Sequence, residues 1–144
     1  MQISQHLLER IESHAAEAFP GESCGFLTGR VGDDIILDAI PSPNRAGSKQ
    51  EFLIDAALHL KLQRTLREKG QAVIGIYHSH PSGDSLPSEK DRISLNDQNL
   101  VWMITALSES HPPQTRLFGH LRGKSGSKSQ PFDENLLQIA RFVA

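Results

Sequence analysis

The stretch AVIGIYHSHPSGDSLPSEKD, residues 72–91, joins an apolar run to a polar turn that contains two prolines. The run AVIGIYHS and a second one, VWMITALS (residues 101–108), are the most continuously apolar segments of the chain. Such runs between turn residues are typical of strands covered on both faces, which predicts two central strands. Side chains two residues apart on a strand point to the same face. His78 and His80 are therefore expected to converge at the end of the first strand.

Two converging imidazoles indicate a metal site, although His-x-His pairs also occur on ordinary exposed strands. Zinc binds imidazole nitrogen and carboxylate oxygen, and a hydrolytic site usually has three protein ligands and one open position. The turn after the strand can bring a carboxylate back to the histidines, and the candidates are Asp84, Glu89 and Asp91. The spacing alone does not select one of the three.

Ser88 and Asp91 also form a Ser-x-x-Asp string directly behind Pro87. This pattern predicts a helix N-cap with an acidic residue in the first turn. A serine at a helix start can cap the helix in one state and reach a substrate oxygen in another, so both roles are retained.

The rest of the chain alternates predicted helices and strands. Apolar residues at helical spacing predict a first helix from Ile3 to Ala18, ended by Pro20. Asp55 is the predicted N-cap of a second helix, whose leucine stripe stops before Gly70. The other predictions are strands at 22–31, 33–40 and 115–122, loops at 41–50 and 123–131, and helices at 88–100 and 133–144. This order predicts an α/β fold with a mixed β-sheet flanked by helices.

Composition limits the class of protein. At 144 residues the chain has the size of one domain, predicted to cover residues 1–144. A formal net charge of −2 predicts no bulk attraction to nucleic acid or to an anionic membrane. No apolar run approaches the roughly 20 residues that span a bilayer. One cysteine allows no internal disulfide, and the charged N-terminus lacks the apolar segment of a signal peptide, so a cytoplasmic location is expected.

The combined motif resembles a known family. The string HSHPSGDSLPSEKD matches the His-x-His-Pro, six residues, Ser-x-x-Asp signature of the JAMM (MPN+) metalloproteases, and GESCGFLTG resembles their upstream glutamate strand. The resemblance covers most of the chain, because the order of predicted elements also fits. It implies the JAMM/MPN fold, which is cytidine-deaminase-like, and a zinc-dependent hydrolase.

The resemblance also assigns the metal ligands. It implies that His78, His80 and Asp91 bind Zn²⁺, with a water in the fourth position. On this interpretation Asp84 and Glu89 belong to the loop and to the surface of the following helix.

Two further residues receive catalytic roles from the same resemblance. Glu22 would take a proton from the attacking water and pass it to the leaving amine, and Ser88 would stabilise the developing oxyanion. Cys24 with a histidine base is an alternative nucleophile, which its apolar neighbours disfavour.

Small prokaryotic members of this family resemble peptidases that trim the C-terminal tail of ubiquitin-like sulfur-carrier proteins. The expected partner is such a protein, whose tail could add as a strand beside the segment PSPNRAGSKQEF (residues 41–52), with Asn44 as a polar contact. Two alternatives remain. The first is a metal-binding protein like the C-terminal domain of RadC-type proteins, without protease activity. The second is an MPN scaffold that assembles complexes.

Overall fold

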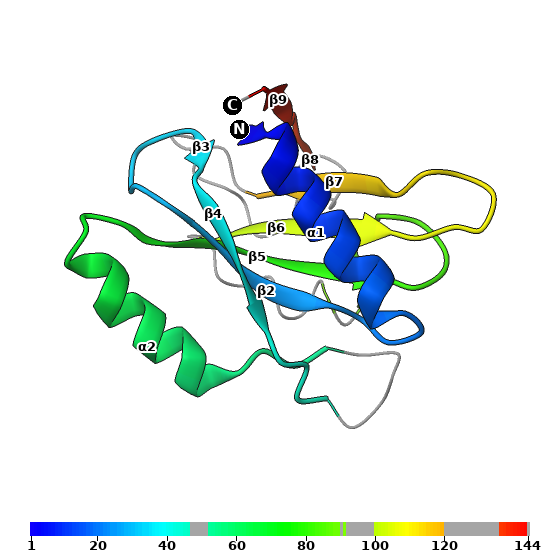
Figure 1. Cartoon of the computed structure of the whole chain (residues 1–144), viewed down its shortest axis with the longest axis horizontal. Coiled ribbons are helices and arrows are strands. Elements are labelled where there is room, and N and C mark those ends of the chain that lie inside the picture. The colour runs from blue at the N-terminus through cyan, green and yellow to red at the C-terminus, as the bar shows by residue number, and fades with distance from the viewer. Residues whose placement is uncertain (47–51, 90, 92–99, 120–135, 144) are drawn as a thin grey trace.

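The computed structural model describes residues 1–46, 52–89, 91, 100–119 and 136–143. Its main sheet has six strands in the order β4-β2-β5-β6-β7-β8 (Figure 1). β5 and β6 pair in parallel and lie inside the sheet, and the other neighbours are antiparallel. The strands are β2 (Cys24–Gly29), β4 (Asp38–Ser42), β5 (Ala72–His80), β6 (Val101–Ala106), β7 (Gln114–Phe118) and β8 (Leu136–Leu137). The predicted mixed α/β fold is confirmed, and both predicted central strands are central.

The two helices of the described residues cover opposite faces of this sheet. Leu8 and Ile11 of α1 (Gln5–Ala18) belong to the same buried cluster as Leu27 of β2. The neighbouring residue, Phe26, contacts the ring of His59 on α2 (Ala56–Arg67), with ring centroids 5.0 Å apart. Adjacent residues of a strand point to opposite faces, so α1 and α2 lie on different sides of β2.

The second helix begins and ends as predicted. Asp55 Oδ1 accepts hydrogen bonds from the backbone N–H groups of Ala57 and Leu58, at 3.0 and 3.1 Å. After Arg67 the chain reaches Gly70, whose φ of +69° is a left-handed conformation that glycine adopts without strain. This cap fixes the start of α2 beside the segment that leads to the site described below.

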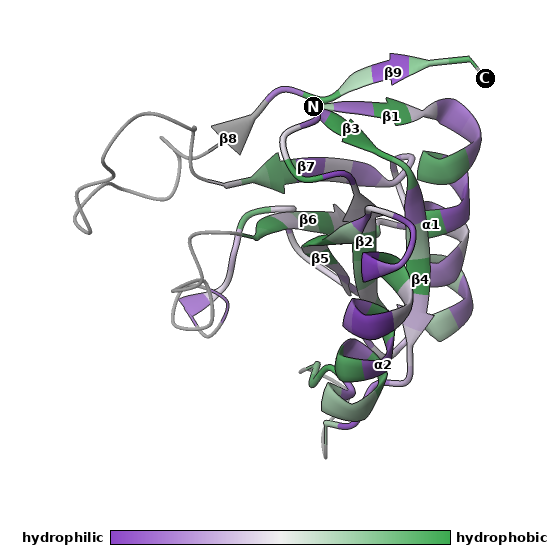
Figure 2. Cartoon of the chain, turned by 90° about the vertical axis from the view of Figure 1, so that its left-hand side faces the viewer, coloured by the Kyte–Doolittle hydropathy of each residue, from purple (hydrophilic) through white to green (hydrophobic). Residues whose placement is uncertain are grey.

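Two predictions at the ends of the chain were wrong. Ile3 lies in β1 (Gln2–Ser4) rather than in the first helix, and Ser4 caps that helix through its hydroxyl oxygen. The predicted helix at 133–144 is replaced by β8 and β9 (Ala140–Phe142) in its described part. A second sheet explains β1 and β9, whereas β8 pairs with β7 in the main sheet. β1 pairs in parallel with β9 and with β3 (Ile35–Ile36), so a second sheet of order β3-β1-β9 supplies backbone hydrogen bonds that helical spacing could not reveal (Figure 2).

That second sheet also divides the predicted strand at 33–40. Ile35–Ile36 pair with β1, whereas Asp38–Ser42 pair with β2 in the main sheet. The predicted strand at 115–122 is described as Gln114–Phe118, and the loop at 123–131 lies outside the described residues. The helix predicted at 88–100 is described only in part, with Glu89 and Asp91 in helical conformation. No helix among the described residues is long and apolar enough to cross a bilayer.

The site lies on the face of the sheet that α2 covers. A small buried cluster of Trp102, Ile104 and Phe118 occupies this face, and Phe52, Ile76 and Leu86 pack against it. Figure 2 shows hydrophobic stretches along β5, β6 and β7, which form the floor of this region. The side chains at the end of β5 therefore lie next to an apolar surface. The low local dielectric there strengthens electrostatic interactions and hydrogen bonds.

Candidate metal centre

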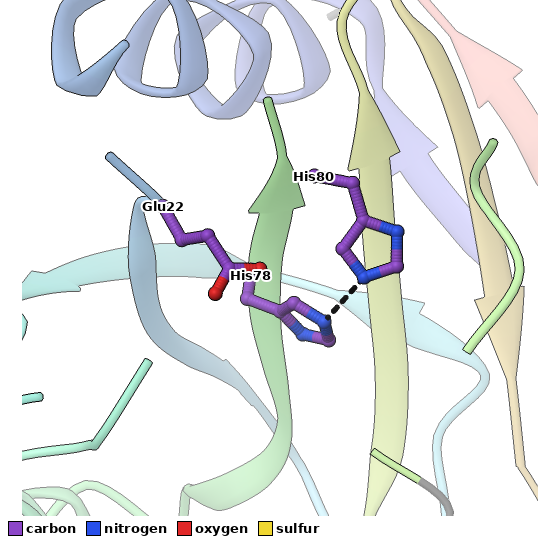
Figure 3. Close-up of side chains that lie close together, drawn as sticks. All are labelled: Glu22, His78 and His80. Atoms are coloured by element: carbon purple, nitrogen blue, oxygen red, sulfur yellow. Dashed lines mark hydrogen bonds between the residues drawn. The ribbon is translucent and has the colours of Figure 1, made fainter. Parts of the chain in front are cut away.

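The histidine pair occupies the end of β5, inside the sheet. His78 pairs with Cys24 on β2 and with Ile104 on β6, so strands flank it on both sides. Its side chain is fully buried, whereas that of His80 is 14% exposed. The two Nε2 atoms lie 3.3 Å apart, so the imidazoles converge on one point (Figure 3).

The carboxylate of Asp91 completes a triangle with these nitrogens. Asp91 Oδ2 lies 3.2 Å from Nε2 of His78 and 3.1 Å from Nε2 of His80, and the residue is buried. Ser88 holds it there, because the backbone N–H of Ser88 donates to the same oxygen at 2.7 Å. In return, Ser88 Oγ accepts from the backbone N–H of Asp91 at 3.1 Å. This reciprocal arrangement is a helix-capping box, which returns Asp91 to the end of β5.

The three donor atoms have the spacing that a tetrahedral metal ion requires. Ligands about 2.0 to 2.1 Å from zinc lie about 3.3 Å from one another at tetrahedral angles, and the three distances here are 3.1, 3.2 and 3.3 Å. Glu22 is a further carboxylate near the histidines, with ligand atoms of the three groups within 4.8 Å of one another. The three atoms of His78, His80 and Asp91, called the donor triangle below, lie closer together than the group that includes Glu22, so they fit one shared ion better.

The protonation state of His80 also indicates a cation between this histidine and Asp91. Its Nδ1 lies 2.8 Å from the backbone oxygen of Asp84, a pure acceptor, so Nδ1 carries the hydrogen. The Nε2 of neutral His80 then presents a lone pair to the Asp91 carboxylate, and a cation must lie between them. That cation is either a proton or a metal ion. Metal-binding histidines typically donate their other ring N–H to a backbone carbonyl in this way.

The pKa shifts describe a cluster that attracts a cation. Burial disfavours the ionised form of Asp91, but hydrogen bonds from His78 and His80 outweigh it and lower the pKa of this carboxyl. Burial lowers the pKa of His78 and keeps its imidazole neutral. Burial also acts against the charged form of His80, but the Asp91 hydrogen bond raises its pKa overall. The ionised carboxylate of Asp91 and the neutral imidazole of His78 are the forms that bind metals, and His80 would release its proton on metal binding.

Glu22 lies beside the histidines, just before β2 (Figure 3). Two hydrogen bonds between the strands fix this position, because Ser23 N–H donates to Ser79 Oγ at 2.8 Å and Ser79 N–H donates to Ser23 O at 3.0 Å. Burial raises the pKa of Glu22 to about 7, and the charges of His80 and Asp91 act in opposite directions. A carboxyl with this pKa can both accept and return a proton near neutral pH.

The other candidates of the sequence have different contacts and surroundings. Asp84 and Glu89 are exposed, and Asp84 Oδ1 accepts from the backbone N–H of Leu86 at 3.0 Å. Cys24 is buried, and burial raises the pKa of its thiol to about 11, so it stays protonated at neutral pH. Asn44, predicted to contact substrate, donates to the backbone oxygen of Glu22 at 3.1 Å.

One residue at the site was missed from the sequence. The ring of Phe52 stacks on His78, with centroids 4.1 Å apart and planes 18° from parallel. The signal was weak, since Phe52 is a lone aromatic residue in the short run EFLI after a polar loop.

Two imidazoles and a carboxylate, with a second carboxyl beside them, are a donor set typical of hydrolytic metal centres. The family described as prokaryotic homologs of the JAB domain matches residues 4–118. The chain belongs to this family.

Curated relatives cover most of the chain. A CysO-cysteine peptidase of Mycobacterium tuberculosis is 26% identical over 116 residues, which cover 81% of this chain and 80% of that protein. A desampylase of Pyrococcus furiosus is 31% identical over 102 residues, 71% of each chain. A probable TtuB-protein conjugate cleaving protease of Thermus thermophilus is 34% identical over 90 residues, 62% of this chain and 59% of that protein. These relatives are peptidases or conjugate-cleaving enzymes by name.

Solved structures share the fold. Protein DSY2949 of Desulfitobacterium hafniense aligns with a TM-score of 0.79 and 27% identity, over 99% of this chain and 93% of the other. A structure described as "JAMM: A Metalloprotease-like Zinc Site in the Proteasome and Signalosome" aligns with a TM-score of 0.57 and 20% identity, over 99% and 97% of the two chains. The expected JAMM/MPN fold is confirmed.

Proposed function

We propose that the chain is a zinc-dependent peptidase that hydrolyses the bond after the C-terminal tail of a ubiquitin-like protein of the sulfur-carrier type. The observation that carries this proposal is the triangle of His78, His80 and Asp91, with sides of 3.1 to 3.3 Å, next to the buried carboxyl of Glu22. The names of the relatives add the substrate class, because they refer to conjugates of CysO and TtuB and to desampylation.

Zinc is the metal that this donor set favours. Two imidazole nitrogens and one carboxylate oxygen leave one open position, as in catalytic zinc sites. Zinc would act as a Lewis acid that lowers the pKa of a bound water to about 7 and polarises the scissile carbonyl.

Glu22 moves the proton in this proposal. Its carboxylate accepts a proton from the attacking water, and the resulting carboxylic acid donates it to the leaving amine. In the metal-free chain the pKa of Glu22 is about 7, so this carboxyl changes charge readily near neutral pH.

Ser88 stabilises the oxyanion in this proposal. Its Oγ accepts the backbone N–H of Asp91 as a cap, and a hydroxyl keeps one O–H donor that is independent of its acceptor sites. Ser88 is exposed, so in this proposal its O–H donates to the bound carbonyl oxygen while the cap stays intact. Capping and oxyanion stabilisation are thus compatible.

The substrate tail would add to the edge of the main sheet. β4 is the terminal strand of that sheet, and its last residues, Pro41 and Ser42, begin the segment 41–52. An extended tail beside an edge strand gains main-chain hydrogen bonds with little demand on sequence.

A cleavage assay on a tailed carrier tests the proposal. The substrate is a ubiquitin-like carrier protein with a short peptide fused after its C-terminal tail, and the products are identified by mass spectrometry. We expect one cut, at the end of the tail, and none when the tail is shortened so that the folded carrier blocks access. A zinc-loaded, folded protein that leaves the fusion intact would overturn the peptidase proposal in favour of the RadC-like or scaffold alternative.

A further inference from the structure

The imidazole of His78 is held differently from that of His80. His80 uses its Nδ1 in a hydrogen bond to the backbone oxygen of Asp84, at 2.8 Å. Nδ1 of His78 is buried and has no hydrogen-bond partner among the residues that the structure describes. Metal-binding histidines almost always use the second ring nitrogen to fix their orientation, and loss of that partner typically lowers metal affinity about 10- to 100-fold. Another contact must therefore orient His78.

Aromatic rings surround His78 instead. Phe52 stacks on the imidazole with centroids 4.1 Å apart and planes 18° from parallel. Trp102 meets the imidazole edge-on, with centroids 5.7 Å apart and planes at 81°. Phe52 and Trp102 also contact each other, at 5.9 Å and 63°. The torsion about the bond that joins a histidine ring to its Cβ is broad and soft, so a flat ring stacked on one face is an effective restraint.

We propose that Phe52 is a positioning residue, which holds the His78 imidazole in its metal-binding orientation by stacking in place of a hydrogen bond. This inference rests on the metal site of the proposed function. It concerns how the ligand is oriented, and Phe52 itself takes no part in the reaction.

The backbone around Phe52 is arranged to place the ring accurately. Leu53 N–H donates to Asn44 Oδ1 at 3.0 Å, and Arg45 N–H donates to Leu53 O at 2.9 Å. Asn44 Nδ2 donates in turn to the backbone oxygen of Glu22 at 3.1 Å. One amide side chain thus connects the backbone that carries the proton shuttle to the segment that carries the stacking ring.

The start of α2 provides a second hydrogen-bonded point after Phe52. Asp55 caps the helix, and its backbone N–H donates to Ser42 Oγ of β4 at 3.2 Å. Both hydrogen-bonded points, Leu53 and Asp55, follow Phe52 closely in the chain. They hold the backbone of the segment that carries the Phe52 ring beside His78.

Three variants of the full chain separate stacking from general packing. Phe52→Leu keeps an apolar side chain and removes the ring, whereas Phe52→Tyr keeps the ring. Leu53→Ala is the matched control, because Leu53 is the next residue and its side chain is 58% exposed. Each metal-free protein is titrated with Zn²⁺ in competition with a chromophoric chelator, and with Co²⁺ to record the absorption bands that report ligand geometry. Melting temperatures verify folding.

We expect Phe52→Leu to bind zinc roughly 10-fold or more weakly, the low end of what loss of an orienting partner costs, with altered cobalt bands. Phe52→Tyr and Leu53→Ala should match the wild type in both measurements. A Phe52→Leu variant with wild-type affinity and spectrum would overturn the inference, as would an equal loss in Phe52→Tyr.

Two controls keep the outcomes distinct. In metal-free wild type, a ring stacked at 4.1 Å must shift the carbon-bound protons of the His78 imidazole upfield, and absence of that shift in NMR spectra overturns the inference even if Phe52→Leu does not fold. A wild-type protein that binds no metal refutes the proposed function first, and this inference with it. A wild type that binds zinc but cleaves nothing refutes only the peptidase proposal.

Discussion

Replacement of Glu22 by glutamine removes a proton acceptor and leaves the shape of the side chain nearly unchanged. Glu22 lies beside the donor triangle but outside its 3.1 to 3.3 Å sides, so zinc content should stay at the wild-type level. An amide cannot take a proton from water, and general acid–base catalysis typically contributes about 10²- to 10⁴-fold. Turnover should fall by that factor, which corresponds to roughly 2.7 to 5.4 kcal/mol in the activation barrier.

The assay for Glu22→Gln measures kcat on the tailed carrier fusion, the zinc content and the binding of the carrier separately. Binding should persist, because the proposed tail contacts lie along the sheet edge rather than at Glu22. Near wild-type kcat in a zinc-loaded variant would refute the role of Glu22 as proton shuttle. Loss of zinc in the same variant would instead indicate that Glu22, rather than Asp91, is the third metal ligand.

Three further predictions concern the neighbours of Glu22 and its pH dependence. Asp91→Ala and His80→Ala should lose zinc in elemental analysis, whereas Asp84→Ala should keep it, because the contact of Asp84 with His80 uses a backbone oxygen that the substitution retains; the reverse pattern would reassign the ligands. Cys24→Ala should keep most of its peptidase activity, since a thiol with a pKa of about 11 is protonated at neutral pH; an inactive variant that is folded and loaded with zinc would contradict this. Burial raises the pKa of Glu22 from 4.5 to about 7 in the metal-free chain, so its stabilising contribution is complete below about 4.5 and is lost as the pH rises through about 7. Metal-free wild type should therefore lose melting temperature relative to Glu22→Gln between pH 5 and 8, and a constant difference would contradict the raised pKa.

The fold was predictable where local signals and tertiary packing agree. The runs AVIGIYHS and VWMITALS became β5 and β6, and the cap at Asp55 and the glycine at Gly70 marked the limits of α2. Predictions failed where strand pairing between the chain ends decided the structure. Ile3 pairs with Arg141, a contact across the whole sequence that apolar spacing in either segment could not indicate.

The candidate site shows the same division. Convergence of His78 and His80 follows from strand geometry alone, and the spacing of the motif left three carboxylates open. The capping box at Ser88 brings Asp91 back to the histidines, a geometry that depends on hydrogen bonds at 2.7 and 3.1 Å rather than on sequence distance. The stack of Phe52 on His78 was not predictable, because it depends on how the segment after β4 returns to β5.

Zinc titration of the metal-free protein tests the central claim most directly. Protein freed of metal by a chelator is supplied with increasing Zn²⁺, and the initial rate of cleavage of the tailed carrier fusion is measured at each step. A single site formed by His78, His80 and Asp91 predicts no cleavage without zinc, a linear rise in rate, and a plateau at one zinc per chain. Full cleavage by the metal-free protein, or a rate that does not respond to zinc, would contradict the account.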